Sequence, residues 1–309
     1  MKNITVYDTH CDTASLLSDK ISLVSNNLHF DLERAMRYSG YMQVFAVFSD
    51  PEYGNECRTK CMQVLAELKK QVARNADKIA ICCNGDEVDM AIKSGRVAGM
   101  IALEGADLVQ STDDIQMLYD NGFRIITLTW NGSNKLASGI GDENDGGLTD
   151  FGQAALSLMN ELGIIADVSH SSVKTFYDVI EHSKRPVMAS HSNSKSICSH
   201  RRNLTDEQFC MLRDMGGYVG LNLYPDFLND SQKASIDDIL RHADRFLELG
   251  GENCIGLGAD LDGVEYLPEG IEGVQDFYKI ADALEKHYNS MICEKILWGN
   301  FDAFMKKML

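Results

Sequence analysis

A histidine and two aspartates stand close together near the start of the chain, in the stretch 8–12, which reads Asp8-Thr9-His10-Cys11-Asp12. They directly follow the short apolar run 4–7, which predicts a strand. Because alternate residues of a strand face the same side, His10 and Asp12 can turn an imidazole and a carboxylate toward one point. Such a pair could bind a divalent cation, although a tripeptide of this kind also occurs by chance in many chains.

Further groups of the same chemical types stand directly after other apolar runs. They are Glu104, His170, His191 and Asp260. Three of the eight histidines would therefore meet three carboxylates if the ends of these strands lay together. Clustered imidazole and carboxylate groups are the usual ligands of divalent metals in proteins. We predict a metal centre at the strand ends.

The elements that must position these residues follow a repeated strand-helix pattern, which is typical of a parallel sheet covered by helices. We expect eight strands, at residues 4–7, 42–48, 97–103, 124–130, 164–168, 186–190, 217–223 and 254–259, with a minor extra strand at 79–82. Helices are expected at 56–75, 113–121, 149–162, 172–182, 205–215, 235–249, 274–287 and from 291 to the end. The pattern predicts an α/β fold, a (β/α)8 TIM barrel, in which all the carboxyl ends of the strands meet at one rim.

The boundaries of these helices are marked by capping residues. Thr205 and Gln208 predict a capping box, and glycines follow several helices, at positions 122, 163, 216 and 250. No shift in composition marks a domain boundary, so we expect residues 1–309 to form one domain.

The number of candidate ligands predicts two metals, because five are too many for one open tetrahedral zinc. The expected assignment is His10 and Asp12 on the first metal, His170 and His191 on the second, and Glu104 bridging the two. Two cations held ~3.5–4 Å apart generate a hydroxide from a shared water near neutral pH. Asp260 is then free to accept a proton from the attacking water and donate it to a leaving group.

The composition excludes several classes of partner. The chain has 29 basic and 46 acidic residues and a formal net charge of −17, which repels nucleic-acid phosphates and anionic lipid surfaces. No apolar run is long enough for a membrane span or a signal peptide. Nine cysteines without a repeated metal-site spacing argue against a disulfide framework. We expect a cytoplasmic protein that binds neither nucleic acid nor membrane.

Six short motifs, in order over nearly the whole chain, resemble those of the membrane (renal-type) dipeptidases, peptidase family M19 of the amidohydrolase superfamily. They lie at residues 8–12, 104–105, 167–170, 190–192, 199–204 and 258–263. The resemblance implies a barrel of the metal-dependent hydrolase type and a dipeptidase with two Zn²⁺ per chain, bridged by Glu104. It also implies that Arg202 binds the terminal carboxylate of the substrate, that Tyr224 lines the pocket and that Asp260 is the catalytic acid/base.

One position departs from the family pattern. Many relatives carry a substrate-contacting histidine after the fourth strand, where this chain has Trp130. An indole cannot accept a proton as an imidazole can, so the substrate preference is expected to differ. Trp130 either packs in the core or forms part of the pocket, and Asn131 or Asn134 could supply the missing hydrogen-bond donor. We count Trp130 and Asn131 among the substrate-binding residues.

Other polar residues receive no role from the sequence. Five histidines are expected at the surface or at helix ends: His29, His182, His200, His242 and His287. Asp107 and Asp262, beside key residues, either support the ligands or are solvated in loops.

The expected reaction is hydrolysis of the peptide bond of a small dipeptide by a hydroxide that bridges the metals. Two alternatives stay open. Another hydrolase of the same superfamily, such as an N-acyl amino acid amidase, a lactonase or a deaminase, could use the same centre. A non-catalytic metal or peptide binder could keep the barrel, although it would have no use for Asp260 as a proton shuttle. Homodimers are common among such barrels, so a homodimer is compatible with this chain.

Overall fold

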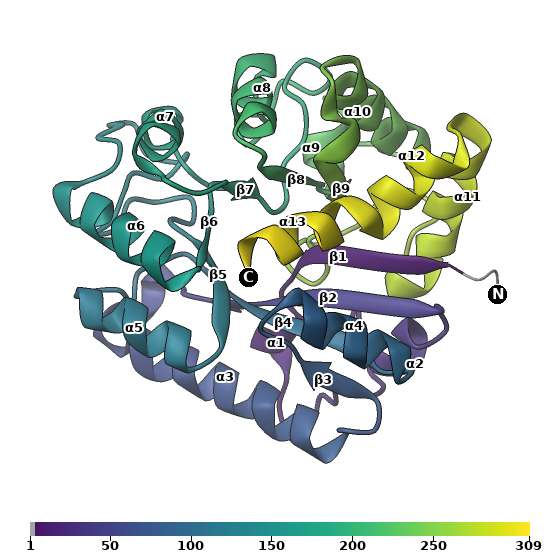
Figure 1. Ribbon diagram of the computed structural model, residues 1–309, viewed down its shortest axis with the longest axis horizontal. Helices are drawn as coiled ribbons and strands as arrows, with labels where there is room; N and C mark the ends of the chain where they lie inside the picture. The colour runs from purple at the N-terminus through teal and green to yellow at the C-terminus, as the bar shows by residue number, and fades with distance from the viewer. Residues whose placement is uncertain (1–3) are drawn as a thin grey trace.

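The computed structural model describes residues 4–309, which form one sheet of parallel strands surrounded by helices (Figure 1). The strands are β1 (Thr5–Cys11), β2 (Gly40–Phe48), β3 (Ile79–Ile81), β4 (Val97–Glu104), β5 (Phe123–Thr127), β6 (Ile165–Asp167), β7 (Met188–Ala189), β8 (Tyr218–Leu221) and β9 (Ile255–Leu257). Their order is β2-β1-β9-β8-β7-β6-β5-β4-β3, and β2 also pairs with β4. This last pairing closes eight strands into a ring and confirms the predicted TIM barrel.

The ninth strand, β3, lies outside the ring. It pairs with the first residues of β4, from Val97 to Gly99, whereas β5 pairs with β4 from Ile101 onward. The minor strand predicted at 79–82 is therefore present, as an addition at the amino end of β4.

The helices are α1 (Thr13–Leu16), α2 (Leu32–Ala35), α3 (Cys57–Arg74), α4 (Gly85–Lys93), α5 (Thr112–Asp120), α6 (Asp150–Leu162), α7 (Val173–His182), α8 (Asp206–Asp214), α9 (Pro225–Leu228), α10 (Ile236–Glu248), α11 (Phe277–His287), α12 (Ser290–Glu294) and α13 (Asn300–Met308). The capping box predicted at Thr205 is present, and Gly163 ends α6 in the left-handed region at φ 81°. The sequence reading missed α4, whose N-cap Asn84 accepts a hydrogen bond from the backbone of Glu87. Across the described part of the chain, every helix is too short or too polar to cross a membrane.

The barrel interior has its own apolar cluster, separate from the larger one between strands and helices. It combines inward-facing strand residues such as Met100 and Tyr218 with Phe301 and Phe304 of α13. Tyr218, the first residue of β8, lies 5.0 Å from Phe301 between ring centroids. Helix α13, yellow in Figure 1, therefore covers the amino ends of the strands. The carboxyl ends form the opposite rim, where the polar residues lie.

A bulge in β1 sets the direction of its last side chains. Asp8 pairs with Gln43 and Cys11 with Phe45, so β1 uses one more residue than β2 over this stretch. Val6 and Cys11 consequently both belong to the outer core, although strict alternation would place them on opposite sides. The extra residue turns His10 toward the barrel axis, which is a common use of bulges beside functional sites.

Candidate metal centre

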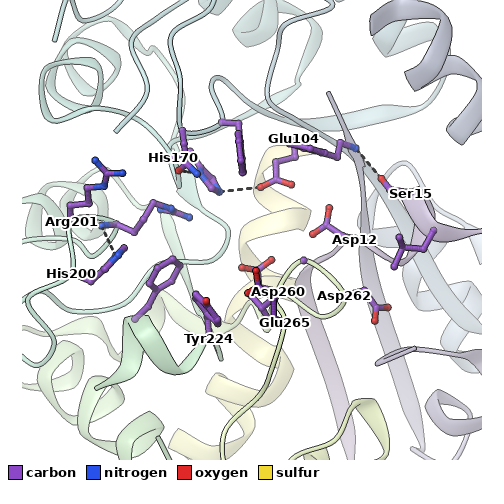
Figure 2. Close-up of a pocket in the computed structure, with 18 residues that line it drawn as sticks. Asp12, Ser15, Glu104, His170, His200, Arg201, Tyr224, Asp260, Asp262 and Glu265 are labelled. Carbon is purple, nitrogen blue, oxygen red and sulfur yellow. Dashed lines mark hydrogen bonds and ion pairs between the residues drawn. The ribbon is translucent and has the colours of Figure 1, made fainter. Parts of the chain in front are cut away.

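Six polar residues from five strands meet at the carboxyl rim. Figure 2 labels four of them, Asp12, Glu104, His170 and Asp260. Glu104 is the last residue of β4, His10 lies near the end of β1, and Asp12 follows that strand. The other three stand in the loops after β6, β7 and β9, namely His170, His191 and Asp260. All six are less than one-tenth exposed. The structure therefore brings together all of the residues that the sequence reading placed at the centre.

Glu104 lies between the two groups of histidines. Its Oε2 atom is 3.5 Å from Nε2 of His10, and its Oε1 atom is 3.0 Å from Nε2 of His170 and 3.7 Å from Nε2 of His191. Asp12 completes the side of His10, with 3.4 Å between its Oδ2 atom and Nε2 of His10. One carboxylate oxygen thus faces each side of the centre, as expected for a group that bridges two cations.

The donor atoms fit a binuclear metal site. Nε2 of His10 is buried and has no hydrogen-bond partner among residues 4–309. Nε2 of His170 and Nε2 of His191 are 2.9 Å apart, and both face Glu104. Ligand atoms of His10, Glu104 and His191 lie within 4.8 Å of one another, as do those of His10, Asp12 and Asp260. Nitrogen and oxygen donors in this mixture suit zinc and other divalent ions.

The electrostatics of these groups also favour cations. Burial lowers the pKa of His191 well below its usual range and that of His170 to about 4, so both imidazoles are neutral at pH 7 and can bind a metal. Burial and the charge of Glu104 raise the pKa of Asp12 to about 8. A divalent cation bound between these carboxylates would offset their mutual repulsion.

Two hydrogen-bonded supports hold the histidine rings. Nδ1 of His191 pairs with Oγ of Ser190 at 2.8 Å, and this hydroxyl donates to Oδ2 of Asp167 at 2.6 Å. Nδ1 of His170 pairs with Oδ1 of Asn131 at 3.1 Å. Both rings therefore present Nε2 to the centre, an arrangement typical of metal-binding histidines. The predicted contact of Asn131 with substrate stays a prediction, and its carbonyl oxygen already orients His170.

Asp260 approaches the centre from β9. Its Oδ2 atom accepts a hydrogen bond of 2.9 Å from Nδ2 of Asn222, and its Oδ1 atom lies 3.9 Å from Nε2 of His10. Burial raises the pKa of Asp260, which suits a group that exchanges protons. Its backbone is in the left-handed region at φ 61°. Its ligand atom also lies within 4.8 Å of those of His10 and Asp12, a grouping that could bind a metal ion.

A cavity of about 500 Å³ opens above the centre. Arg202, Tyr224 and Trp130 all line it. Arg202 is only 6% exposed, yet none of its three guanidinium nitrogens has a hydrogen-bond partner within residues 4–309. Its guanidinium instead lies 5.4 Å from the ring centroid of Phe227. A buried cation without an acceptor is costly, so its position indicates an anionic ligand.

Two histidines that received no role from the sequence lie elsewhere than expected, one at the cavity and one in the core. His200, expected at the surface, lines the pocket and lies 4.5 Å from Phe227 between ring centroids. His242, expected at the surface or at a helix end, is fully buried. Ser194 N donates to its Nδ1 atom and Leu228 O pairs with its Nε2 atom, so both ring nitrogens have partners. Because His242 lies on the apolar face of α10, with Ile239 and Phe246, the sequence pattern could have predicted that it is buried.

Comparisons with known proteins agree with this geometry. The family model of the membrane dipeptidases (peptidase family M19) matches residues 1–308. An uncharacterized dipeptidase of Schizosaccharomyces pombe is 30% identical over 313 residues, which cover 92% of this chain and 74% of that protein.

Two solved structures share the fold. The dipeptidase AC, a metallopeptidase of family M19, has a TM-score of 0.89 at 25% identity, with 99% of each chain covered. A metallopeptidase from Rhodobacter sphaeroides, solved with a phosphinate mimic of the dipeptide L-Ala-D-Ala, has a TM-score of 0.89 at 24% identity, with 100% of each chain covered.

Proposed function

Because the chain belongs to peptidase family M19, the membrane dipeptidase family, we propose that it hydrolyses the peptide bond of small dipeptides with two zinc ions. The observation that supports a dipeptide most directly is the buried guanidinium of Arg202 beside the binuclear centre. A dipeptide always offers a carboxylate one residue away from its only peptide bond. We also place the protein in the cytoplasm, a proposal that its nine free cysteines support.

The residues that would hold the zinc ions are those around Glu104. His10 and Asp12 would bind one ion, His170 and His191 the other, and Glu104 both. When bound, the zinc pair lowers the pKa of water and polarises the substrate carbonyl.

The protein's own groups supply the proton transfers and the orientation of the substrate. Asp260 would accept a proton from the attacking water and donate it to the departing amine. Asn222 holds its Oδ2 atom, which leaves Oδ1 directed toward the centre. Arg202 would bind the substrate carboxylate with two parallel hydrogen bonds, which fixes the peptide bond over the metals.

A substrate panel tests this function. Protein loaded with zinc is expected to hydrolyse dipeptides, and to lose about 10- to 100-fold in kcat/KM when the carboxylate of the same dipeptide is amidated, because Arg202 then lacks its ionic partner. N-acetyl amino acids and lactones serve as the competing substrate classes. Faster turnover of either class would assign the protein to another amidohydrolase activity. Binding of dipeptides without turnover would identify it as a binder.

Replacing Arg202 with methionine is expected to raise KM and to lower kcat/KM about 10- to 100-fold, because charge-assisted hydrogen bonds to the substrate are lost. The thermal midpoint should stay equal or rise, since the substitution removes a buried charge that lacks a protein partner. Steady-state kinetics and thermal melts measure both effects. The matched control is Arg201→Met, which removes the same charge from an exposed neighbour. A lower midpoint with unchanged KM would assign Arg202 a structural role.

A further inference from the structure

Three apolar side chains line the cavity, and we call them the apolar wall: Leu16, Phe48 and Trp130. The ring centroids of Phe48 and Trp130 are 5.2 Å apart, with an edge-to-face angle of 68°. The hydroxyl of Ser15 accepts a hydrogen bond from the backbone of Phe48, which fixes the neighbouring Leu16 beside this pair. Leu16 is 40% exposed, so it offers apolar surface to a molecule in the cavity.

The apolar wall lies across the barrel mouth from Arg202. In the closed ring of eight strands, β2, which ends in Phe48, is opposite β7, whose following loop carries Arg202. Figure 2 shows the same separation, with Ser15 at one side of the pocket and Arg201 at the other. The centre, with Glu104 and His170, lies between them.

The binding direction of a dipeptide follows from this separation. Arg202 would hold the carboxylate, which belongs to the C-terminal residue, and the peptide bond would lie over the centre. The N-terminal residue must then extend to the far side, where Trp130 lies 6.2 Å from His170 between ring centroids. The side chain that meets the apolar wall is therefore the N-terminal one.

We propose that the apolar wall is the specificity site for the N-terminal side chain, and that it selects dipeptides with an apolar N-terminal residue. This proposal rests on the proposed dipeptidase function. An apolar side chain would cover Leu16 and the two rings from water, whereas a charged side chain would be desolvated against groups that offer no ionic partner. The indole N–H of Trp130 would not compensate a charged side chain, because it is neutral and can donate only one hydrogen bond.

Two matched sets of dipeptides test the proposal with zinc-loaded protein. In the first set the N-terminal residue varies, as Leu-Ala, Gly-Ala and Glu-Ala, and in the second the C-terminal residue varies, as Ala-Leu, Ala-Gly and Ala-Glu. We expect kcat/KM for Leu-Ala to exceed that for Gly-Ala at least about tenfold, with Glu-Ala the poorest of the three. The ratio Ala-Leu to Ala-Gly should be smaller.

Variants of the apolar wall then test whether its residues cause the preference for Leu-Ala over Gly-Ala. Leu16→Ser and Trp130→Ala should each lower the Leu-Ala to Gly-Ala ratio by about three- to tenfold, and Trp130→Phe should restore most of it. Leu16→Ser covers the case in which Trp130→Ala fails to fold, because Leu16 lies on the surface. The control is Met90→Ser, an exposed apolar residue on α4 outside the pocket.

The outcomes separate the two proposals. No turnover of any dipeptide by the zinc-loaded wild type would overturn the dipeptidase function itself. Turnover without a preference for Leu-Ala, or a preference that both Leu16→Ser and Trp130→Ala leave unchanged, would overturn only the role of the apolar wall.

Discussion

Replacing Asp260 with asparagine is expected to lower kcat about 10²- to 10⁴-fold while both metals stay bound, because the variant keeps the shape of the side chain but cannot exchange a proton. Asparagine also tolerates the left-handed backbone at this position, where φ is 61°, better than most residues other than glycine. The hydrogen bond between Asp260 and Asn222 can persist through the amide oxygen. Steady-state kinetics together with the zinc content per chain measure the effect.

Asp262→Asn is the matched control for this substitution. Asp262 also lines the pocket and also has a left-handed backbone, at φ 66°. Its two carboxylate oxygens accept hydrogen bonds from His29 N and from the hydroxyl of Thr13, so it supports a loop rather than facing the centre. We expect its effect on kcat to be less than about tenfold. If Asp260→Asn instead loses one zinc per chain, Asp260 is a ligand, as its place beside His10 and Asp12 also allows.

The sequence predicts the composition of the centre because a barrel turns distant positions into neighbours. Once eight strands are recognised, each residue that directly follows a strand must lie at the same rim, whatever its distance along the chain. This argument alone predicts that Glu104 and His191 lie close together. The buried strands were also recognisable, since β4 is apolar on both faces.

Other features depend on contacts that no local pattern reveals. The bulge that turns His10 inward comes from the register between β1 and β2, and neither strand marks it in its own sequence. The link from His191 through Ser190 to Asp167 joins the loop after β7 to the last residue of the neighbouring strand β6. The apolar wall joins the last residue of β2 to residues that follow β1 and β5, and apolar residues at such positions are equally typical of a core.

Glu104→Gln is expected to have the largest effect on the metals, because Glu104 is the one carboxylate within residues 4–309 that faces both His10 and His170. Although burial alone would raise the pKa of Glu104, His10 and His170 hold it well below its usual range, so the side chain is ionised at neutral pH. Glutamine keeps its size but removes the charge that two cations would share. We expect zinc content to fall from two per chain to less than one, and turnover to be lost.

Thermal melts provide the second measurement, since a ligand that binds only the folded state stabilises it according to its concentration relative to Kd. At a zinc concentration 100 times Kd the gain for the wild type is about 2.7 kcal/mol per site, and Glu104→Gln should show little of it. Glu265→Gln is the control, because Glu265 lines the same pocket but is exposed, and this variant should keep the zinc-dependent rise. Loss of one zinc per chain would assign Glu104 to a single metal. Retention of both zinc ions would refute its role as a bridging ligand, because the histidines and Asp12 would then suffice to bind both ions.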